Sequence, residues 1–556
     1  MLGAAGWWGV GLAYASVQLP MIAGLAKHRG GWHQYLKSPA VAAPLTVMVG
    51  LGLAVANPVL SAMGASSGGL IQSAVGVWFA MAAGYAGGRI MAQDALKNKV
   101  HQRGALVAEE TSQQDGRARA GEEHNITVAG RAIPPLDETK HFKLIGTTGT
   151  GKSTAIREIL NAALARGDRA VVADPDAGYL SRFYDPGRGD VVLNPFDERS
   201  VKWDLFSEIR SSFDVEQLAR SLIPDQEGDR IWRGYARTFF TAVTRQAHEA
   251  GVTDVAELYR LLMVADTKEL RTLVHATPAQ PFLEEHNAKM FDSIRSVTSS
   301  TLGALEYIAQ QKGEPFSVRS WVSDEKAGVL FMPYKAGQIA ALRSAISGWM
   351  RLAIFEAMDG PELPAEQPSK GKQGLWFVVD ELDALGQIDG LKDALARLRK
   401  FGGRCVLGFQ SIAQVSSTYG HGDAHTIVEN CGNTLILRCS ASEGGGTARF
   451  ASQLIGEREI LRTTVSRSRR SNEMTGSVSH SEHYSVESAV MASQIEQLPD
   501  LSGYLKYASD PQWRRVKLQA RQTWQESRAA TPRAALGRAA GGGTAAGREV
   551  EGRSYD

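Results

Sequence analysis

The feature that most constrains this chain is a glycine-rich segment that follows a short apolar run and precedes a helical pattern. The segment, GTTGTGKS, fits G-x-x-x-x-G-K-[ST] at every fixed position. Its glycines let successive backbone N–H groups turn toward a polyphosphate, and the following helix N-terminus favours the anion. Lys152 can reach the β and γ phosphates, and Ser153 can ligate Mg²⁺. The motif predicts a nucleotide-binding P-loop made of Gly146, Thr147, Thr148, Gly149, Thr150, Gly151, Lys152, Ser153 and Thr154.

The length and charge of the chain limit the classes of protein that it can represent. At 556 residues it is too long for one core, and about 150 residues per domain suggests three or four units. A formal net charge of +2 does not by itself indicate nucleic-acid binding, so any basic surface that binds nucleic acid must be local. The three cysteines form no C-x-x-C pair or disulfide framework, which fits buried thiols in a reducing compartment.

The amino-terminal part differs sharply from the rest, because no Asp or Glu occurs before Asp94. Two uncharged stretches, residues 2–26 and 38–88, are long enough for one and two bilayer spans, at about 20 residues each. A signal peptide fits poorly, because the first ten residues contain no basic segment. Basic residues near 27–37 and 89–103 mark cytoplasmic loops, which places the amino terminus and the loop at 61–69 outside. We expect two or three membrane helices, with everything after about residue 95 in the cytoplasm.

The following segments alternate between strand and helix patterns. The run at 126–136 suggests a hairpin that leads into the P-loop strand, and RAVVA at 169–173 is a buried-strand pattern. Strand, P-loop, helix and strand begin a doubly wound α/β domain. From about 211 to 311 amphipathic helical patterns dominate, and strand patterns resume at 328–332. This order predicts an all-α insertion within the α/β domain.

Two acidic residues, Asp380 and Glu381, end the apolar strand pattern LWFVV. Beside a P-loop, Asp380 would bind Mg²⁺ or its water, and Glu381 would polarise the attacking water. The alternative is a solvated acidic turn. Gln410 follows the next strand pattern, where its amide can contact the γ-phosphate or its water, although a simple turn residue fits that position equally well. A later basic stretch (Arg467, Arg469 and Arg470) is compatible with phosphate contacts or with a solvated loop.

These patterns divide the chain into six regions. The regions are a transmembrane module of two or three helices at 1–93, a linker or partly helical stalk at 94–124, the first part of the nucleotide domain at 125–210, the all-α insertion at 211–312, the second part of the nucleotide domain at 313–522, and a tail at 523–556 expected to be disordered.

The combined signals resemble the type IV secretion coupling proteins of the TrwB/TraD family. The resemblance runs from about 126 to 518, and it is closest in the P-loop block and in RAVVADPDAGYLSRFYDPGRGDVVLNPFDERSVKWDLFSEI. Further matches are FSVRSW, GLWFVVDELDALGQIDGLKDALARLRKFGGRCVLGFQSIAQVSSTYG and IEQLPDLSGYLKYA. The family implies a RecA-like domain with an all-α insertion, assembled as a homo-hexameric ring on a stem in the bacterial inner membrane.

The resemblance also implies partners, cofactors and roles for individual residues. Members use ATP and Mg²⁺, couple a relaxase-bound plasmid or integrative element to the secretion channel, and drive transfer of single-stranded DNA. Lys152 would hold phosphate, Ser153 and Asp380 would hold Mg²⁺, Asp380 and Glu381 would form the Walker B pair, and Gln410 would be the sensor glutamine. The segment LARLRKFGG matches the family's arginine finger, which selects Arg399. The sequence by itself does not separate Arg399 from Arg397 or Arg438.

Two other functions are compatible with a membrane-anchored chain that carries a P-loop. One is a membrane-anchored pump for double-stranded DNA of the chromosome-segregation type, which should carry a carboxyl-terminal winged-helix module. The other is a docking receptor for secreted proteins, in which nucleotide regulates assembly. The intact Lys152, Asp380 and Glu381 favour a catalytically active motor over an inactive scaffold.

Overall fold

A computed structural model describes residues 5–27, 32–62, 69–97, 99–108, 125–225, 228–324, 326–364, 374–441, 446–468 and 477–519. Two compact units emerge from the contacts between residues, one formed by 1–105 with 456–488 and the other by 106–455 with 489–556. The expected loop at 61–69, most of the loop at 360–374, Arg469, Arg470 and the tail at 523–556 lie largely or wholly outside the described residues.

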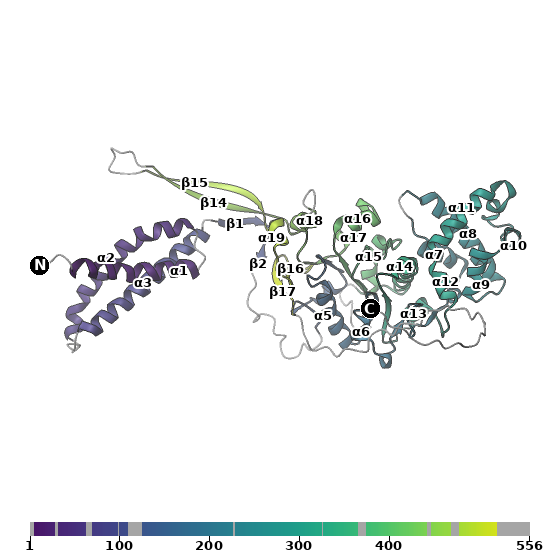
Figure 1. Ribbon diagram of the computed structural model, residues 1–556, viewed down its shortest axis with the longest axis horizontal. Helices are drawn as coiled ribbons and strands as arrows, with labels where there is room; N and C mark the ends of the chain where they lie inside the picture. Colours follow the sequence, from purple (N-terminus) through teal and green to yellow (C-terminus); the bar gives the residue numbers. More distant parts are fainter. Residues whose placement is uncertain are drawn as a thin grey trace, which may run out of the picture. The chain divides into compact units, whose positions relative to one another are not determined.

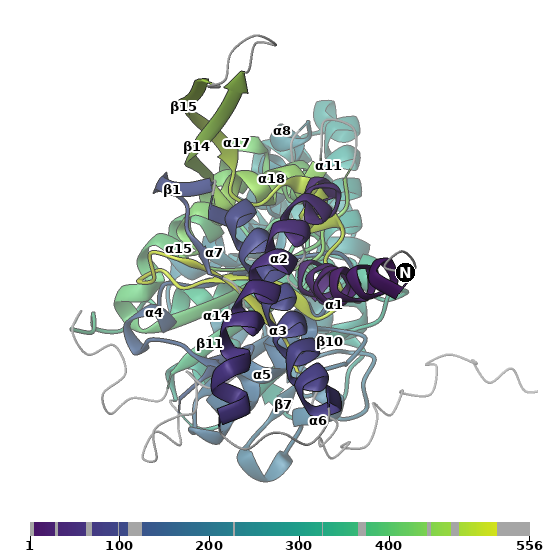
Figure 2. The same cartoon turned by 90° about the vertical axis from the view of Figure 1, so that its left-hand side faces the viewer.

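The first unit contains three long helices and a three-stranded sheet (Figures 1 and 2). The helices are α1 (Ala5–Lys27), α2 (Trp32–Ala62) and α3 (Gly69–Lys97). Glycines let α1 and α3 approach closely, because a Cβ at Gly84 or Gly88 would lie 2.2 Å from the carbonyl oxygen of Val17 or Met21. This four-residue spacing of small residues is typical of close helix–helix packing. Within the described part of the chain, no helix combines the length and apolarity that a bilayer span requires, so the predicted spans are unsupported by the structure.

The sheet of this unit corrects part of the sequence interpretation. Its order is β1-β14-β15, formed by β1 (Lys99–Gly104), β14 (Glu457–Ser468) and β15 (Ser477–Ser488), all antiparallel. Helix α3 ends at Lys97, so the segment expected to be a partly helical linker or stalk begins in a helix and also contains the strand β1. Arg467 lies in β14 and not in a loop. β1 is stabilised by a partner more than 350 residues away, and the part of β14 that contains Arg467 is stabilised by the neighbouring strand β15; local composition reveals neither pairing.

The second unit is built on a ten-stranded sheet in the order β2-β17-β16-β13-β5-β12-β11-β6-β10-β7. Seven neighbouring strands, from β13 to β7, are parallel, and they read as apolar runs because both faces are buried. They are β13 (Asn433–Ile436), β5 (Phe142–Ile145), β12 (Gly403–Phe409), β11 (Leu375–Val379), β6 (Arg169–Pro175), β10 (Val329–Tyr334) and β7 (Val191–Val192). The antiparallel β16 (Ser502–Lys506) and β17 (Trp513–Lys517), then β2 (Val107–Ala108), extend one edge.

The register of the parallel strands aligns their carboxyl ends. Ile145 pairs with Phe409 and Ile436, while Val379 pairs with Leu407 and Ala173. The residues that follow these strands therefore meet at one edge of the sheet. Below them the core is continuous, with Leu144, Val172, Val378 and Val406 all buried.

All regular elements in the described part of 212–309 are helices, joined by turns and short loops (Figure 1). Its α-helices are α7 (Ser212–Leu222), α8 (Arg230–Glu249), α9 (Val255–Tyr259), α10 (Thr267–Leu273), α11 (Ala288–Thr301) and α12 (Ala304–Ala309). The short strands β8 (Lys202–Trp203) and β9 (Pro315–Phe316) pair in parallel where the insertion leaves and rejoins the α/β domain. Buried Glu208 joins both sides of this base, because it accepts hydrogen bonds from Trp203 Nε1 and from the backbone N–H of Val318.

Candidate nucleotide site

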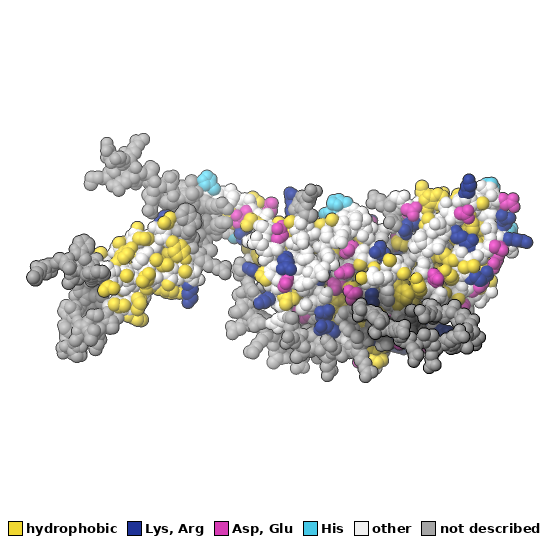
Figure 3. Space-filling view, in the orientation of Figure 1, with side chains coloured by type: hydrophobic (Ala, Val, Ile, Leu, Met, Phe, Trp, Pro, Cys, Tyr) yellow, Lys and Arg dark blue, Asp and Glu magenta, His cyan; other side chains and the backbone are white. Residues whose placement is uncertain are grey.

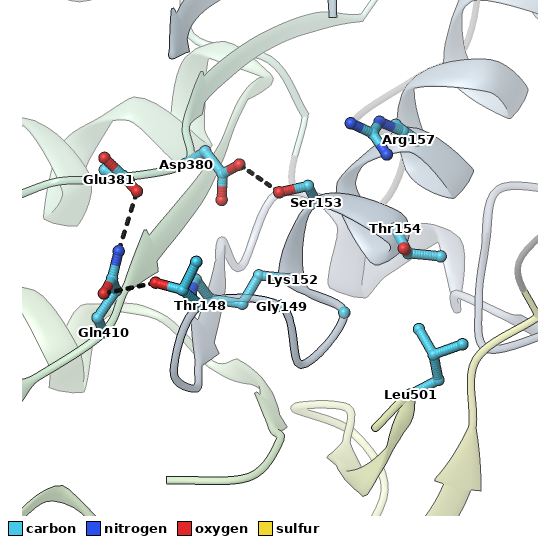
Figure 4. Close-up of a pocket in the computed structure, with 11 residues that line it drawn as sticks. Thr148, Gly149, Lys152, Ser153, Thr154, Arg157, Asp380, Glu381, Gln410 and Leu501 are labelled. Atoms are coloured by element: carbon cyan, nitrogen blue, oxygen red, sulfur yellow. Dashed lines mark hydrogen bonds between the residues drawn. The ribbon is translucent and has the colours of Figure 1, made fainter. Parts of the chain in front are cut away.

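The glycine loop connects β5 to α5 (Lys152–Ala165) at the carboxyl edge of the sheet. It borders a cleft of about 260 Å³. Figure 4 shows the loop in the middle, with Glu381 and Gln410 on one side and Leu501 on the other. The residues lining the cleft are Thr148, Gly149, Gly151, Lys152, Ser153, Thr154, Arg157, Asp380, Glu381, Gln410 and Leu501. The predicted phosphate-binding loop, acidic pair and sensor glutamine thus meet at one place.

The conformation of the loop depends on its glycines. Gly149 and Gly151 have φ values of 77° and 121°, which side-chain-bearing residues rarely adopt. A Cβ at Gly146 would lie 2.8 Å from Thr150 Oγ1 and 2.9 Å from Leu437 Cβ, so the first glycine is also required by close packing. The loop is held from outside by hydrogen bonds from Thr147 N to Arg438 O and from Leu501 N to Thr150 O, both 2.9 Å. These contacts keep the loop open for an anion.

Lys152 lies folded back over the loop. Its Nζ donates to Gly146 O at 2.6 Å, and the side chain is largely buried. Burial lowers the pKa of Lys152, while the charges of Asp380 and Glu381 act in the opposite direction. An ammonium held only by loop carbonyls can exchange them for phosphate oxygens, which are stronger, charged acceptors.

Asp380 is held in one orientation by two hydroxyl groups. Both Ser153 Oγ and Tyr179 Oη donate to Asp380 Oδ2 at 2.7 Å. The other oxygen, Oδ1, is buried and has no hydrogen-bond partner in the described part of the chain. A buried carboxylate oxygen without a donor is expensive, and a hard cation or its water would satisfy it. The pairing of Asp380 with the Ser153 hydroxyl therefore fits Mg²⁺, which these two side chains would hold.

Glu381 and Gln410 form a second pair on one side of the cleft (Figure 4). Gln410 Nε2 donates to Glu381 Oε1 at 2.9 Å, and Thr148 Oγ1 donates to Gln410 Oε1 at 3.0 Å. Gln410 thus connects the P-loop to the carboxylate. Burial raises the pKa of Glu381, the charge of Asp380 raises it further, and the hydrogen bond from Gln410 lowers it. A carboxylate whose pKa is raised in this way is a better proton acceptor at neutral pH.

The three arginines proposed for the finger lie in different places. Arg399 begins a 3₁₀ turn (Arg399–Phe401) that precedes β12, so it lies at the sheet edge opposite the P-loop, roughly 20 Å away for a seven-residue strand. Arg397 is on the preceding turn of helix, and both side chains are exposed. Arg438 lies at the P-loop edge and pairs with Asp500 at 2.7 Å. Arg399 is therefore separate from the site of its own chain.

Four further residues border or support the cleft without having been predicted as site residues: Arg157, Asp174, Tyr179 and Leu501. Asp174 is fully buried and accepts hydrogen bonds from the N–H groups of Tyr179 and Leu180. Burial raises the pKa of Asp174 to about 7. The sequence signals were the Asp-Pro that follows the strand pattern at 169–173 and the family-matching block that contains Asp174 and Tyr179, but neither signal assigned a role to these residues.

Comparison with known proteins identifies the family. A model of the type IV secretion-system coupling protein DNA-binding domain matches residues 125–519. Coupling protein TraD of Escherichia coli K12 is 32% identical over 392 residues, which cover 69% of this chain and 53% of TraD. VirD4 of Bartonella henselae is 32% identical over 119 residues, 21% of this chain and 18% of that protein. The chain therefore spans about half the length of TraD.

Solved structures give the same result for the fold. Unbound TrwB lacking its amino-terminal segment superposes with a TM-score of 0.68 and 29% identity, covering 78% of this chain and 97% of that one. TrwB in complex with ADP and Mg²⁺ gives a TM-score of 0.66 at 30% identity, covering 77% of this chain and 96% of that one. The prediction of an α/β nucleotide-binding domain with a helical insertion is confirmed. With the matched region extending over most of the chain, this protein belongs to the type IV secretion-system coupling protein family.

Proposed function

We propose that this protein is a membrane-anchored, hexameric ATPase that couples a relaxosome to a type IV secretion channel and drives transfer of single-stranded DNA. The observation that carries the proposal is the meeting of Lys152, Ser153, Asp380, Glu381 and Gln410 around one cleft in a chain of this family. The set contains a lysine ammonium for the phosphates, two side chains that would bind the metal, a carboxylate that would act as base and an amide that would orient water. A site used only to hold nucleotide would not need the last two.

The proposed chemistry is attack of water on the γ-phosphorus of ATP with release of ADP. Lys152 exchanges its loop carbonyls for the β and γ phosphates, and Glu381 accepts the proton of the attacking water. Gln410 orients that water from its position between Thr148 and Glu381. When bound by Ser153 and Asp380, Mg²⁺ supplies positive charge to the phosphate oxygens.

The proposed trans contribution is the approach of Arg399 from a neighbouring subunit. Because Arg399 is exposed at the opposite edge of the sheet, it can act only on a site outside its own chain. A guanidinium delivered in this way stabilises the charge of the transition state. This arrangement requires a ring or another head-to-tail assembly, and it makes hydrolysis dependent on contact between subunits.

Anchoring in the bacterial inner membrane is proposed on the basis of surface composition. Large apolar side chains of α1–α3, including Leu12, Met48, Leu51 and Trp78, are exposed, and Figure 3 shows apolar side chains spread over this helical unit. A soluble protein rarely presents so much apolar surface. Fractionation of cells with carbonate and detergent extraction tests the proposal. Release of the whole chain by carbonate alone would contradict it.

ATPase assays of the purified full chain with single- and double-stranded DNA test the motor proposal. We expect stimulation by single-stranded DNA and none in the Lys152→Ala variant. Equal or greater stimulation by double-stranded DNA would favour the chromosome-segregation type of pump. Hydrolysis that neither DNA stimulates would favour a docking receptor for protein substrates, with nucleotide regulating its assembly.

A further inference from the structure

Arg157 is a cation of the cleft for which the described residues provide no carboxylate partner. It lies in α5, four residues after Ser153 and three after Thr154, so these side chains share one face of the helix. Arg157 lines the cleft, and Figure 4 shows it on the α5 side beyond Ser153 and Thr154. Its guanidinium carbon lies 5.8 Å from the centre of the Tyr179 ring. The guanidinium of Arg157 therefore lies over the ring of Tyr179 at the edge of the site.

The guanidinium of Arg157 has donors that remain available for a ligand. Its Nε is buried without a hydrogen-bond partner, and Arg157 forms no ion pair within the described part of the chain. On the opposite wall, Glu381 accepts from Gln410 and Asp380 Oδ2 accepts from two hydroxyls, while Asp380 Oδ1 is the oxygen assigned above to Mg²⁺. A guanidinium presents several donors in a fixed plane, which matches phosphate oxygens better than any other ligand expected in this cleft.

The position along the helix indicates which part of a nucleotide Arg157 would contact. Lys152 and Ser153 are at the helix N-terminus, where the β and γ phosphates are expected. Arg157 is one turn further on, about 5.4 Å along the helix axis, on the side that carries Thr154. We propose that Arg157 binds the α-phosphate and ribose end of the nucleotide held by the same subunit, an inference that rests on the proposed nucleotide-binding function.

This role differs from that of a trans arginine finger. A contact with the α-phosphate and ribose is made equally in the bound substrate and in the transition state, because no bond to these groups changes during hydrolysis. Its loss raises KM and leaves kcat unchanged. A finger such as Arg399 acts mainly on kcat. Whether a variant changes KM or kcat therefore distinguishes a contact with the α-phosphate and ribose from a trans arginine finger.

Binding measurements on the full chain test the inference. Arg157→Gln removes the charge, Arg157→Lys keeps it, and Lys326→Gln removes a cation whose side chain is 80% exposed on the surface. We expect Arg157→Gln to weaken ADP and a non-hydrolysable ATP analogue by the same factor, about tenfold or 1.4 kcal/mol. The Lys variant should lose less, and Lys326→Gln should bind as the wild type does.

Other outcomes would overturn the inference. Unchanged affinity of Arg157→Gln, or a loss confined to the ATP analogue, excludes a contact with the α-phosphate and ribose. A lower kcat at saturating ATP with unchanged KM would show that Arg157 acts through Tyr179 and Asp380 or on a neighbour. Equal thermal melting temperatures of the nucleotide-free variants establish that the fold is retained. A wild-type chain that binds neither nucleotide would instead refute the proposed function itself.

Discussion

Tyr179 donates a hydrogen bond of 2.7 Å to Asp380, 201 residues further along the chain. The acceptor is the oxygen that also accepts from Ser153, so that among the described residues Asp380 Oδ1 has no donor. Burial raises the pKa of the Tyr179 hydroxyl, and the charge of Asp380 raises it further, so the group stays protonated and continues to donate. Tyr179 therefore fixes the orientation in which Asp380 would meet Mg²⁺.

Replacing Tyr179 by Phe tests this positioning. The ring remains, so the contact with Arg157 is kept, while the donor to Asp380 is lost. Removal of such a supporting hydrogen bond typically weakens metal binding about 10- to 100-fold. We expect the Mg²⁺ concentration for half-maximal nucleotide binding to rise by that factor, with little change at saturating Mg²⁺. A titration identical to that of the wild type would contradict the assignment.

Gln410 gives a prediction about pH dependence. Its hydrogen bond lowers the pKa of Glu381, which burial and Asp380 raise. Gln410→Leu removes that donor, so the pKa of Glu381 should rise. Because a general base must be deprotonated, activity is lost as the pH falls through this pKa. We expect the acidic limb of kcat to move to higher pH in the variant, with nucleotide affinity retained. A shift to lower pH would exclude Glu381 as the base.

The predictable part of the site is the part encoded by local sequence. The P-loop is contiguous, and the pair Asp380-Glu381 and Gln410 each follow an apolar run that is too short and too apolar for a surface helix. Parallel strands bring such positions to one edge, so their meeting could be predicted without coordinates. Tyr179 and Arg157 could not be predicted from the residues themselves, because their roles depend on contacts between chain segments and not on a motif.

The sheet of the first unit shows a different reason for failure. β14 and β15 are rich in Ser, Arg and His, and β1 reads as part of a polar linker. Their pairing joins Lys99 to Arg462, more than 350 residues apart along the chain. Strand formation here depends on the partner strand and not on an apolar run. Local composition therefore favoured a stalk and a basic loop.

Gly408 provides a test of packing behind Asp380. A Cβ at this position of β12 would lie 2.2 Å from Asp380 O and 3.2 Å from Asp380 Oδ1. Gly408→Ala must displace Asp380, and overpacking of this kind costs about 1–3 kcal/mol. We expect that loss in urea unfolding, together with weaker Mg²⁺-dependent nucleotide binding. Gly422→Ala is the matched control, because a Cβ there has no atom within 4 Å and the residue lies inside a helix.

Asp174 predicts how stability changes with pH. Burial raises its pKa from 3.8 to about 7 in the folded protein, although hydrogen bonds from Tyr179 and Leu180 oppose the rise. The folded state therefore binds the proton more tightly, and the stabilisation by protonation is complete below about pH 4 and lost as the pH rises through 7. Relative to Asp174→Asn, the wild type should lose on the order of 3 kcal/mol of free energy of unfolding between pH 5 and pH 8, because about two pH units of that range lie below the folded pKa. Urea unfolding without nucleotide at pH 5 and pH 8 measures the difference, and a constant difference would contradict the raised pKa.

Mixing of inactive variants tests the trans role of Arg399. Arg399→Ala should lower kcat on the order of 10³-fold at saturating ATP, because the transition state loses a cation while substrate binding remains. Arg397→Ala, which removes an equally exposed neighbour, should stay close to the wild type. In mixed assemblies, a Lys152→Ala subunit still presents Arg399 to the intact P-loop of an Arg399→Ala subunit. Activity above that of either variant alone is therefore expected. If the mixture is as inactive as its components, Arg399 does not act between subunits. Because its position at the opposite sheet edge also separates it from the site of its own chain, that result would exclude Arg399 as the finger.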